Sequence, residues 1–232
     1  MSFDYMQEQS PRTIIACRVL ELELEALKAE NPHIETIYMD QNYHRTPHFL
    51  PELLQAKIEE VKESAKQIVL GYGLCSNAIV GLVPPSQGLI VPQAHDCITL
   101  FLGSKEKYNK LFQQSPGTYY LTPGWLKEQK DPLGMLENEY IPKLGREIAE
   151  WGAREEIRHY DSISLIDTQA VDISPYRERA KENARFFEKR YSEIKGDSSL
   201  LRKIIFGPYD REDFFLLQAG EQIKQSWFID KF

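Results

Sequence analysis

The sequence predicts an α/β protein, built on a parallel, Rossmann-like sheet with helices on both faces and additional helices toward the C-terminus. Three observations support this fold class. Short apolar runs alternate with amphipathic segments through the first half of the chain. Their spacing fits strand–helix–strand units, whose right-handed crossovers place the carboxyl ends of all strands at one edge of the sheet. The composition, 42% hydrophobic and 27% charged, is that of a folded globular chain.

The first half of the chain supplies the elements of this sheet. Short apolar runs predict strands over 13–16, 34–39, 67–70, 88–91 and 118–121. Apolar residues repeated every three or four positions predict helices over 18–29, 51–66 and 98–112. Asn31-Pro32 ends the first of these helices, and Pro51 suits the first turn of the second.

The second half has a different pattern. Long charged stretches predict helices over 135–158 and 174–194, and short apolar runs at 162–168 and 214–218 predict strands that extend the sheet. The segment between the two halves shows no composition typical of a linker. We therefore expect a single domain over 1–232, in which 13–125 forms the core that carries the site and 135–232 elaborates it.

Composition and charge exclude several classes of protein. The formal net charge of -7 disfavours partners with phosphate backbones and anionic membranes. No stretch approaches the roughly 20 apolar residues of a membrane helix, and the N-terminus lacks the pattern of a secretory signal. Without that signal the three cysteines are expected to be reduced thiols. We therefore expect a cytoplasmic protein that acts on a small molecule and binds neither nucleic acid nor membrane.

The three cysteines follow three different predicted strands. Cys17 comes directly after the first strand, Cys75 lies in the turn after the third, and Cys97 lies in the loop after the fourth. Ligands of open α/β sheets bind outside the carboxyl ends of the strands. Because parallel strands end at one edge, we expect the three thiols to meet there, each just before a helix begins.

A metal ion would stabilise such a cluster. A cysteine at a helix N-terminus has a lowered pKa, and three thiolates that converge need a cation to compensate their charge. His95 stands two positions before Cys97 and is a side chain that zinc accepts as a ligand. We expect zinc bound by Cys17, Cys75 and Cys97. With His95 as a fourth ligand the site would be closed and structural, and without it one position would be open to a substrate thiol. Asp96 is expected to cap the following helix, and a second role is to orient His95.

Other residues are expected at the same edge of the sheet. His44 follows the second predicted strand and is a candidate acid–base group, a further ligand, or a histidine that pairs with a carboxylate. Gly71 and Gly73 permit a sharp turn and a close approach of the backbone to whatever Cys75 holds. Together with Asn77 they are predicted to bind a cofactor. The pattern lacks the third glycine of a dinucleotide-binding loop.

At these residues the chain resembles the family known as domain of unknown function 1638. The resemblance covers roughly the first 190 residues and depends on several strings in order: Cys17, the loop of His44, Gly71-Tyr72-Gly73-Leu74-Cys75 with Asn77, His95-Asp96-Cys97-Ile98, and Gly117-Thr118-Tyr119-Tyr120 before Pro123-Gly124-Trp125. It implies a bacterial or archaeal protein encoded near corrinoid-dependent methyl-transfer systems, so a corrinoid protein or methyltransferase is an implied partner. It implies no established activity.

Four hypotheses of function follow. The first is a zinc–thiolate protein, an enzyme or accessory protein of one-carbon or methyl-group metabolism; the pair His95-x-Cys97 with a distant cysteine is similar to the zinc site of cobalamin-linked thiol methyltransferases, which have a different fold. The second is a [4Fe–4S] protein with one open iron that acts on a small substrate. The third is a non-catalytic module that delivers a metal or corrinoid. The fourth is a metal-free enzyme with one low-pKa cysteine and His44 or His95 as its base.

Overall fold

The fold is described by a computed structural model, which covers residues 11–29, 31, 33–45, 48–75 and 77–228. It is an α/β protein with parallel sheets flanked by helices, which confirms the predicted fold class. The chain packs as two compact units, which we describe separately. The first comprises Met1–Lys105 and Ser198–Phe232, and the second comprises Glu106–Asp197. The prediction of a single domain concerns whether the units fold together, and it stays a prediction.

The first unit contains a five-stranded sheet with the strand order β2-β1-β3-β4-β8. Its strands are β1 (Arg12–Cys17), β2 (Glu35–Met39), β3 (Gln67–Gly71), β4 (Leu89–Pro92) and β8 (Phe214–Leu217). The first four run parallel, and β8 pairs antiparallel with β4. The four predicted strands at the start of the chain and the late strand that extends their sheet are therefore confirmed. The central strands β1 and β3 are apolar and buried, as expected of a sheet covered on both faces.

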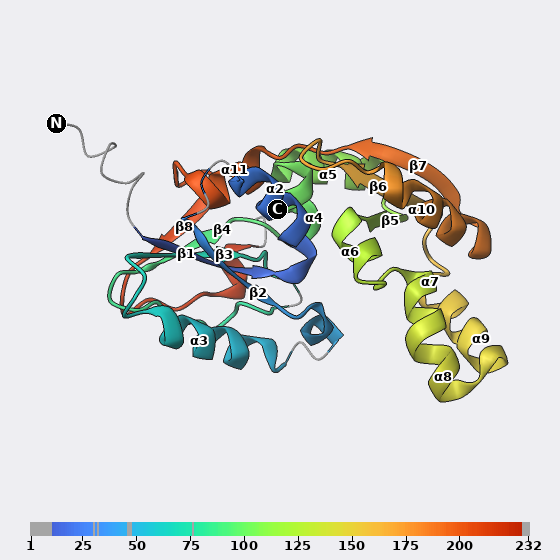
Figure 1. The fold of residues 1–232 in the computed structure, drawn as a ribbon, viewed down its shortest axis with the longest axis horizontal. Coiled ribbons are helices and arrows are strands. Elements are labelled where there is room, and N and C mark those ends of the chain that lie inside the picture. Colours follow the sequence, from blue (N-terminus) through green and yellow to red (C-terminus); the bar gives the residue numbers. More distant parts are fainter. Residues whose placement is uncertain (1–10, 30, 32, 46–47, 76, 229–232) are drawn as a thin grey trace. The chain divides into compact units, whose positions relative to one another are not determined.

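Helices cover both faces of this sheet. They are η1 (Arg18–Leu20), α2 (Glu21–Lys28), η2 (Gln41–Arg45), α3 (Leu50–Val61), α4 (Cys97–Leu102), α11 (Ser199–Phe206) and η4 (Gln225–Trp227). Figure 1 shows α3 on one face and α2, α4 and α11 on the other. α11 packs against α2, α4 and β3 through a row of buried leucines and isoleucines. The predicted helix over 98–112 is wrong as one element, because Gly103 adopts a left-handed conformation and ends α4.

The second unit has its own sheet and core. Three parallel strands pair in the order β5-β6-β7, with bounds β5 (Thr118–Leu121), β6 (Ser162–Asp167) and β7 (Arg190–Lys195). Its helical segments are α5 (Lys105–Gln114), which begins at the boundary, α6 (Pro123–Lys127), α7 (Pro132–Met135), the π-helical η3 (Leu136–Tyr140), α8 (Ile141–Leu144), α9 (Arg146–Glu156) and α10 (Ser174–Phe186). Leu121, Ile163 and Leu165 from the strands pack with Ala180 and Ala184 of α10 in one core.

Three predictions for the chain beyond residue 117 are wrong in detail. The strands at 118–121 and 162–168 do not extend the first sheet but pair in this second one. The predicted helix over 174–194 ends at Phe186, because Glu188 turns in a left-handed conformation and the next residues pair with β6. The predicted helix over 135–158 is interrupted at Gly145, whose φ of 76° is unfavourable for other residues. Periodicity alone does not reveal these breaks.

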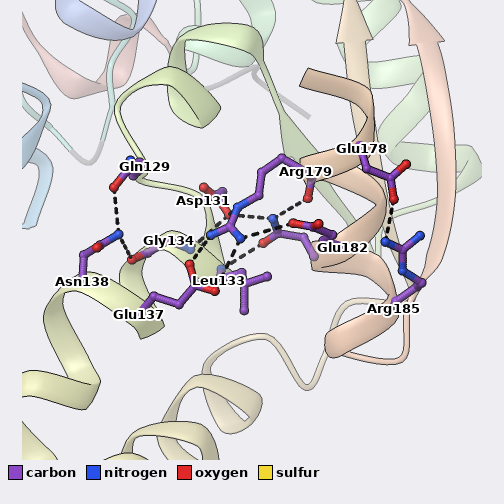
Figure 2. A network of polar contacts seen from close by, with 11 residues as sticks. Gln129, Asp131, Leu133, Gly134, Glu137, Asn138, Glu178, Arg179, Glu182 and Arg185 are labelled. Atoms are coloured by element: carbon purple, nitrogen blue, oxygen red, sulfur yellow. Dashed lines mark hydrogen bonds and ion pairs between the residues drawn. The ribbon is translucent and has the colours of Figure 1, made fainter. Parts of the chain in front are cut away.

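A buried polar network joins α7 to α10 in the second unit (Figure 2). Asp131 caps α7 by accepting a hydrogen bond from the backbone N–H of Gly134 at 3.1 Å. The Asn183 side chain donates to Asp131 at 2.6 Å and accepts from the backbone N–H of Leu133 at 2.9 Å. Arg179 lies beside Asp131 and pairs with Glu137 at 2.6 Å. These contacts fix the start of α7 against α10.

Candidate functional site

The three cysteines belong to the first unit and follow three adjacent strands. Cys17 is the last residue of β1, Cys75 follows the end of β3, and Cys97 is the first residue of α4 after β4. β3 lies between β1 and β4 in the sheet and runs parallel to both. The structure therefore brings the three cysteines to the same sheet edge, as the sequence predicts.

Backbone contacts beyond the strands hold two of these cysteines together. The backbone N–H of Leu74 donates to Ala94, and that of Cys75 donates to His95, each at 2.9 Å. The two loops thus continue the pairing of β3 and β4 past the ends of the strands. Cys75 itself has a φ of 43°, a left-handed conformation that is uncommon for a residue with a side chain.

The two glycines of this turn are needed for close packing. A Cβ atom at Gly73 would lie 2.7 Å from the backbone nitrogen of Asp96, and one at Gly71 would lie 2.6 Å from the Cβ of Ala16. Neither site has room for a side chain, which explains why glycine stands at both. The structure thus gives these residues a packing role, and their predicted part in cofactor binding stays a prediction.

The three thiols share one buried region. Cys17, Cys75 and Cys97 are exposed by 1%, 8% and 6% respectively. Cys17 interacts electrostatically with both other thiols, and Cys75 interacts with Cys97. The hydroxyl of Tyr72, also buried, interacts electrostatically with all three cysteines. The thiols are therefore close enough to interact electrostatically with one another and with Tyr72.

The expected lowering of the thiol pKa values is wrong. Burial raises the pKa of Cys17 to about 12, and it raises the pKa values of Cys75 and Cys97 as well. Backbone N–H groups of Val19 and Cys97 hydrogen-bond to the sulfurs of Cys17 and Cys75 respectively and act in the opposite direction, but they do not offset the desolvation. In addition, η1 has three residues and no helix is assigned directly after Cys75 in the described part of the chain, so a helix dipole contributes little at Cys17 and Cys75. The metal-free hypothesis requires a cysteine with a low pKa, whereas burial raises the pKa values of all three thiols.

The polar residues around the thiols have distinct positions. Asp96 caps α4 by accepting from the backbone N–H of Thr99 at 3.1 Å, which confirms its predicted role. His95 is half-buried and lies close enough to Asp96 to oppose, in small part, the rise that burial causes in the pKa of Asp96. Asn77 is exposed and has a φ of 70°. His44 lies in η2, but its side chain is outside the described part of the structure.

Two residues near the thiols escaped the sequence analysis. Tyr72 stands between the two close-packed glycines and interacts electrostatically with Cys17. Asp40 directly follows β2, and its negative charge raises the pKa of Cys17. Asp40 stands just after a strand, as the cysteines do, so its position in the sequence is a signal for this site. A hydrophobic pattern gives no signal that a buried tyrosine faces a group of thiols.

No set of three histidine, cysteine, aspartate or glutamate side chains encloses a metal position among the residues that the structure describes. In the present arrangement the three thiols therefore share a buried region without forming a coordination shell. Within the same described ranges, no helix has the length and apolar character to cross a bilayer.

Comparison with known proteins assigns the chain to a family. No curated protein and no solved structure gives a significant match. A family model does match residues 38–205; it includes Cys75 and Cys97 but begins after Cys17. Since this range is more than half of the 232 residues, the chain belongs to the family described as protein of unknown function (DUF1638).

Proposed function

We propose that this chain is a metal–thiolate protein in which Cys17, Cys75 and Cys97 bind zinc, and that it acts as an enzyme or accessory protein in one-carbon or methyl-group metabolism. The observation that carries the proposal is the meeting of three thiols from three adjacent strand ends in one buried region. Thiolates in such surroundings need a cation, and zinc is a metal that cysteine sulfur binds well.

The chemistry of the site depends on its ligand set. Three cysteine ligands would leave one coordination position of the zinc open. A substrate thiol could occupy that position, where the zinc would hold it as thiolate. His95 is near enough in the chain to close that position, which would favour a structural role. The Tyr72 hydroxyl, which interacts with all three cysteines, would orient a bound sulfur by donating a hydrogen bond to it. Formation of the site requires the thiols to lose their protons and to turn toward one another.

A second candidate is a [4Fe–4S] cluster held by the same three cysteines. One observation favours it: the thiols interact electrostatically without the arrangement that encloses a single ion. A cluster spreads its cysteine ligands over a larger volume than one zinc ion does, and its fourth iron would be open to a small substrate.

Partners and cellular setting are further parts of the proposal. A reducing, cytoplasmic setting would keep the cysteines available as thiols. A small molecule is the substrate that a largely buried site of this kind admits. A corrinoid protein or methyltransferase is the macromolecular partner that the family resemblance suggests, and delivery of the metal or corrinoid to it is the non-catalytic form of the proposal.

Metal analysis of the anaerobically purified protein tests this proposal. We expect roughly one zinc per chain, and near-complete loss of zinc in the variants Cys17→Ala, Cys75→Ala and Cys97→Ala. Ile98→Val perturbs packing beside Cys97 without removing a thiol and should retain the metal. Iron with absorbance near 400 nm would support the cluster instead. Metal content that is negligible, or equal in the wild type and all three cysteine variants, would exclude both candidates.

A further inference from the structure

The end of the α8–α9 hairpin exposes large apolar side chains. Leu144 is 54% exposed, Ile148 60% and Trp151 68%, and these are three of the six large hydrophobic residues that are exposed in the described part of the chain. α9 directs Ala149 and Ala153 into the core of the second unit. Ile148 and Trp151, three positions apart, therefore form a stripe on the outer side of the same helix. Clustered apolar exposure of this kind marks an interface.

We propose that this stripe is covered by a second copy of the chain, with α9 packed antiparallel to α9 about a twofold axis that crosses the stripe at the level of Glu150 along the helix. This inference is independent of the metal proposal, because every residue that carries it lies in the second unit. An interface with twofold symmetry must be complementary to itself. The shape of α9 and its charges both satisfy that condition.

Gly152 gives the outer surface of α9 a shape that can receive a side chain of another copy. A Cβ atom at Gly152 would meet nothing within 4 Å, so the glycine leaves a notch in the outer surface of α9 beside Ile148. Ile148 and Gly152 stand at equal distances in sequence on either side of Glu150. An antiparallel pair centred there places Ile148 of each copy over Gly152 of the other, and it brings the two Trp151 rings together near the axis.

The charges on α9 favour the antiparallel orientation. Glu147 and Arg154 are two helical turns apart and flank the stripe on the same side. The proposed axis sets Glu147 of each copy near Arg154 of the other, so two opposite-charge pairs form. A parallel pair would instead place these residues of the two copies on opposite sides of the contact, so the pairs would not form. Arg154 is 43% exposed, although it also lies over the Phe186 ring and near Glu188, so its guanidinium is accessible to another copy.

Sedimentation of the full-length protein across about 1–200 µM tests the proposal. We expect a dimer for the wild type and a monomer for Trp151→Glu and Ile148→Glu, because a carboxylate in the stripe would be desolvated without a partner. Phe112→Glu is the matched control: Phe112 is 52% exposed in the same unit but outside the stripe, so this variant should remain dimeric. Because the changed residues are exposed, circular dichroism should show that all the variants are folded.

A charge exchange makes the test specific to the orientation. Glu147→Arg alone should weaken the dimer about tenfold or more, since it replaces two attractive pairs by two repulsive ones. The double variant Glu147→Arg, Arg154→Glu should recover most of that affinity. A monomeric wild type, a dimer that tolerates Trp151→Glu, or failure of the double variant to recover would overturn the proposal. So would a monomer that Trp151→Glu destabilises, because another part of the same chain would then cover the stripe.

Discussion

At the scale of single residues, Glu23 is the titratable group least suited to its surroundings. It lies in the first turn of α2, is 0% exposed, and neither carboxyl oxygen has a hydrogen-bond partner within the described ranges. Burial raises the pKa of Glu23 from 4.5 to about 8. Below pH 4.5 Glu23 is protonated in both the folded and the unfolded protein and costs no stability. As the pH rises toward 8, the unfolded chain ionises more readily than the folded protein, so the free energy of unfolding falls.

This linkage predicts the effect of Glu23→Gln. The variant cannot ionise, so its free energy of unfolding should exceed that of the wild type by about 3 kcal/mol at pH 7 and be nearly equal to it at pH 4.5. Urea unfolding at both pH values provides the comparison. Glu52→Gln changes an exposed glutamate of α3 and should alter stability by less than about 0.5 kcal/mol at either pH. A stability difference that does not grow with pH would show that Glu23 is not forced to ionise in a dry environment.

Residue positions were predicted well from the sequence, but residue environments were not. A cysteine that follows an apolar run must lie at a strand end, so the shared edge of Cys17, Cys75 and Cys97 could be deduced. The pKa values of the thiols depend on how much chain covers them, and much of that cover comes from residues distant in sequence. The helix dipole, which sequence does reveal, was therefore overestimated relative to desolvation.

At the scale of elements, the network between α7 and α10 shows how a few polar groups fix short helices. α7 has four residues and cannot be stable by itself. The Asn183 side chain satisfies the backbone N–H of Leu133 and supports the capping carboxylate of Asp131, and all of these groups are buried. Such hydrogen bonds contribute modestly when made but cost more when one partner is removed.

Asn183→Ala should therefore destabilise the protein by about 2–4 kcal/mol, because it leaves a buried amide N–H and a buried carboxylate without their partner. Asn138→Ala is the same change in the exposed part of the network (Figure 2), where water replaces the lost bonds to Gln129 and Gly134, and it should cost less than about 1 kcal/mol. Guanidinium unfolding of both variants measures the difference. Equal losses would mean that the buried bonds are not what holds α7 against α10.

Element ends were harder to predict than element types, for a local reason. Gly103, Gly145 and Glu188 each end a helix in a left-handed conformation, although the hydrophobic pattern continues past them. Only the glycines carry a signal for such a turn. β7 lacks strong strand character in its sequence and forms because β6 offers six residues of parallel pairing.

At the scale of the whole molecule, the chain leaves the first unit and returns to it. The strands of the second unit intervene between β4 and β8, which are neighbours in one sheet. The apolar runs of the sequence predict nearly every strand but place all of them in one sheet, because such runs do not show which strands pair. Contacts between distant segments decide which sheet a strand joins. In the first unit, α11 makes such contacts, because Leu201 and Ile204 are buried where it packs against α2, α4 and β3.

The two units predict a test of how far their stabilities are linked. Ile204 is 0% exposed in α11, so Ile204→Asp places an unpaired charge in the first unit and should cost more than about 4 kcal/mol. Arg202→Asp adds a carboxylate on the exposed side of the same helix and serves as the control. Hydrogen exchange followed by mass spectrometry should show lost protection in β1 and β3 but retained protection in β5 and β6, because the second core contains no residue of the first. If Ile204→Asp removes protection from both sheets equally, the two units unfold together and behave as the single domain that the sequence predicts.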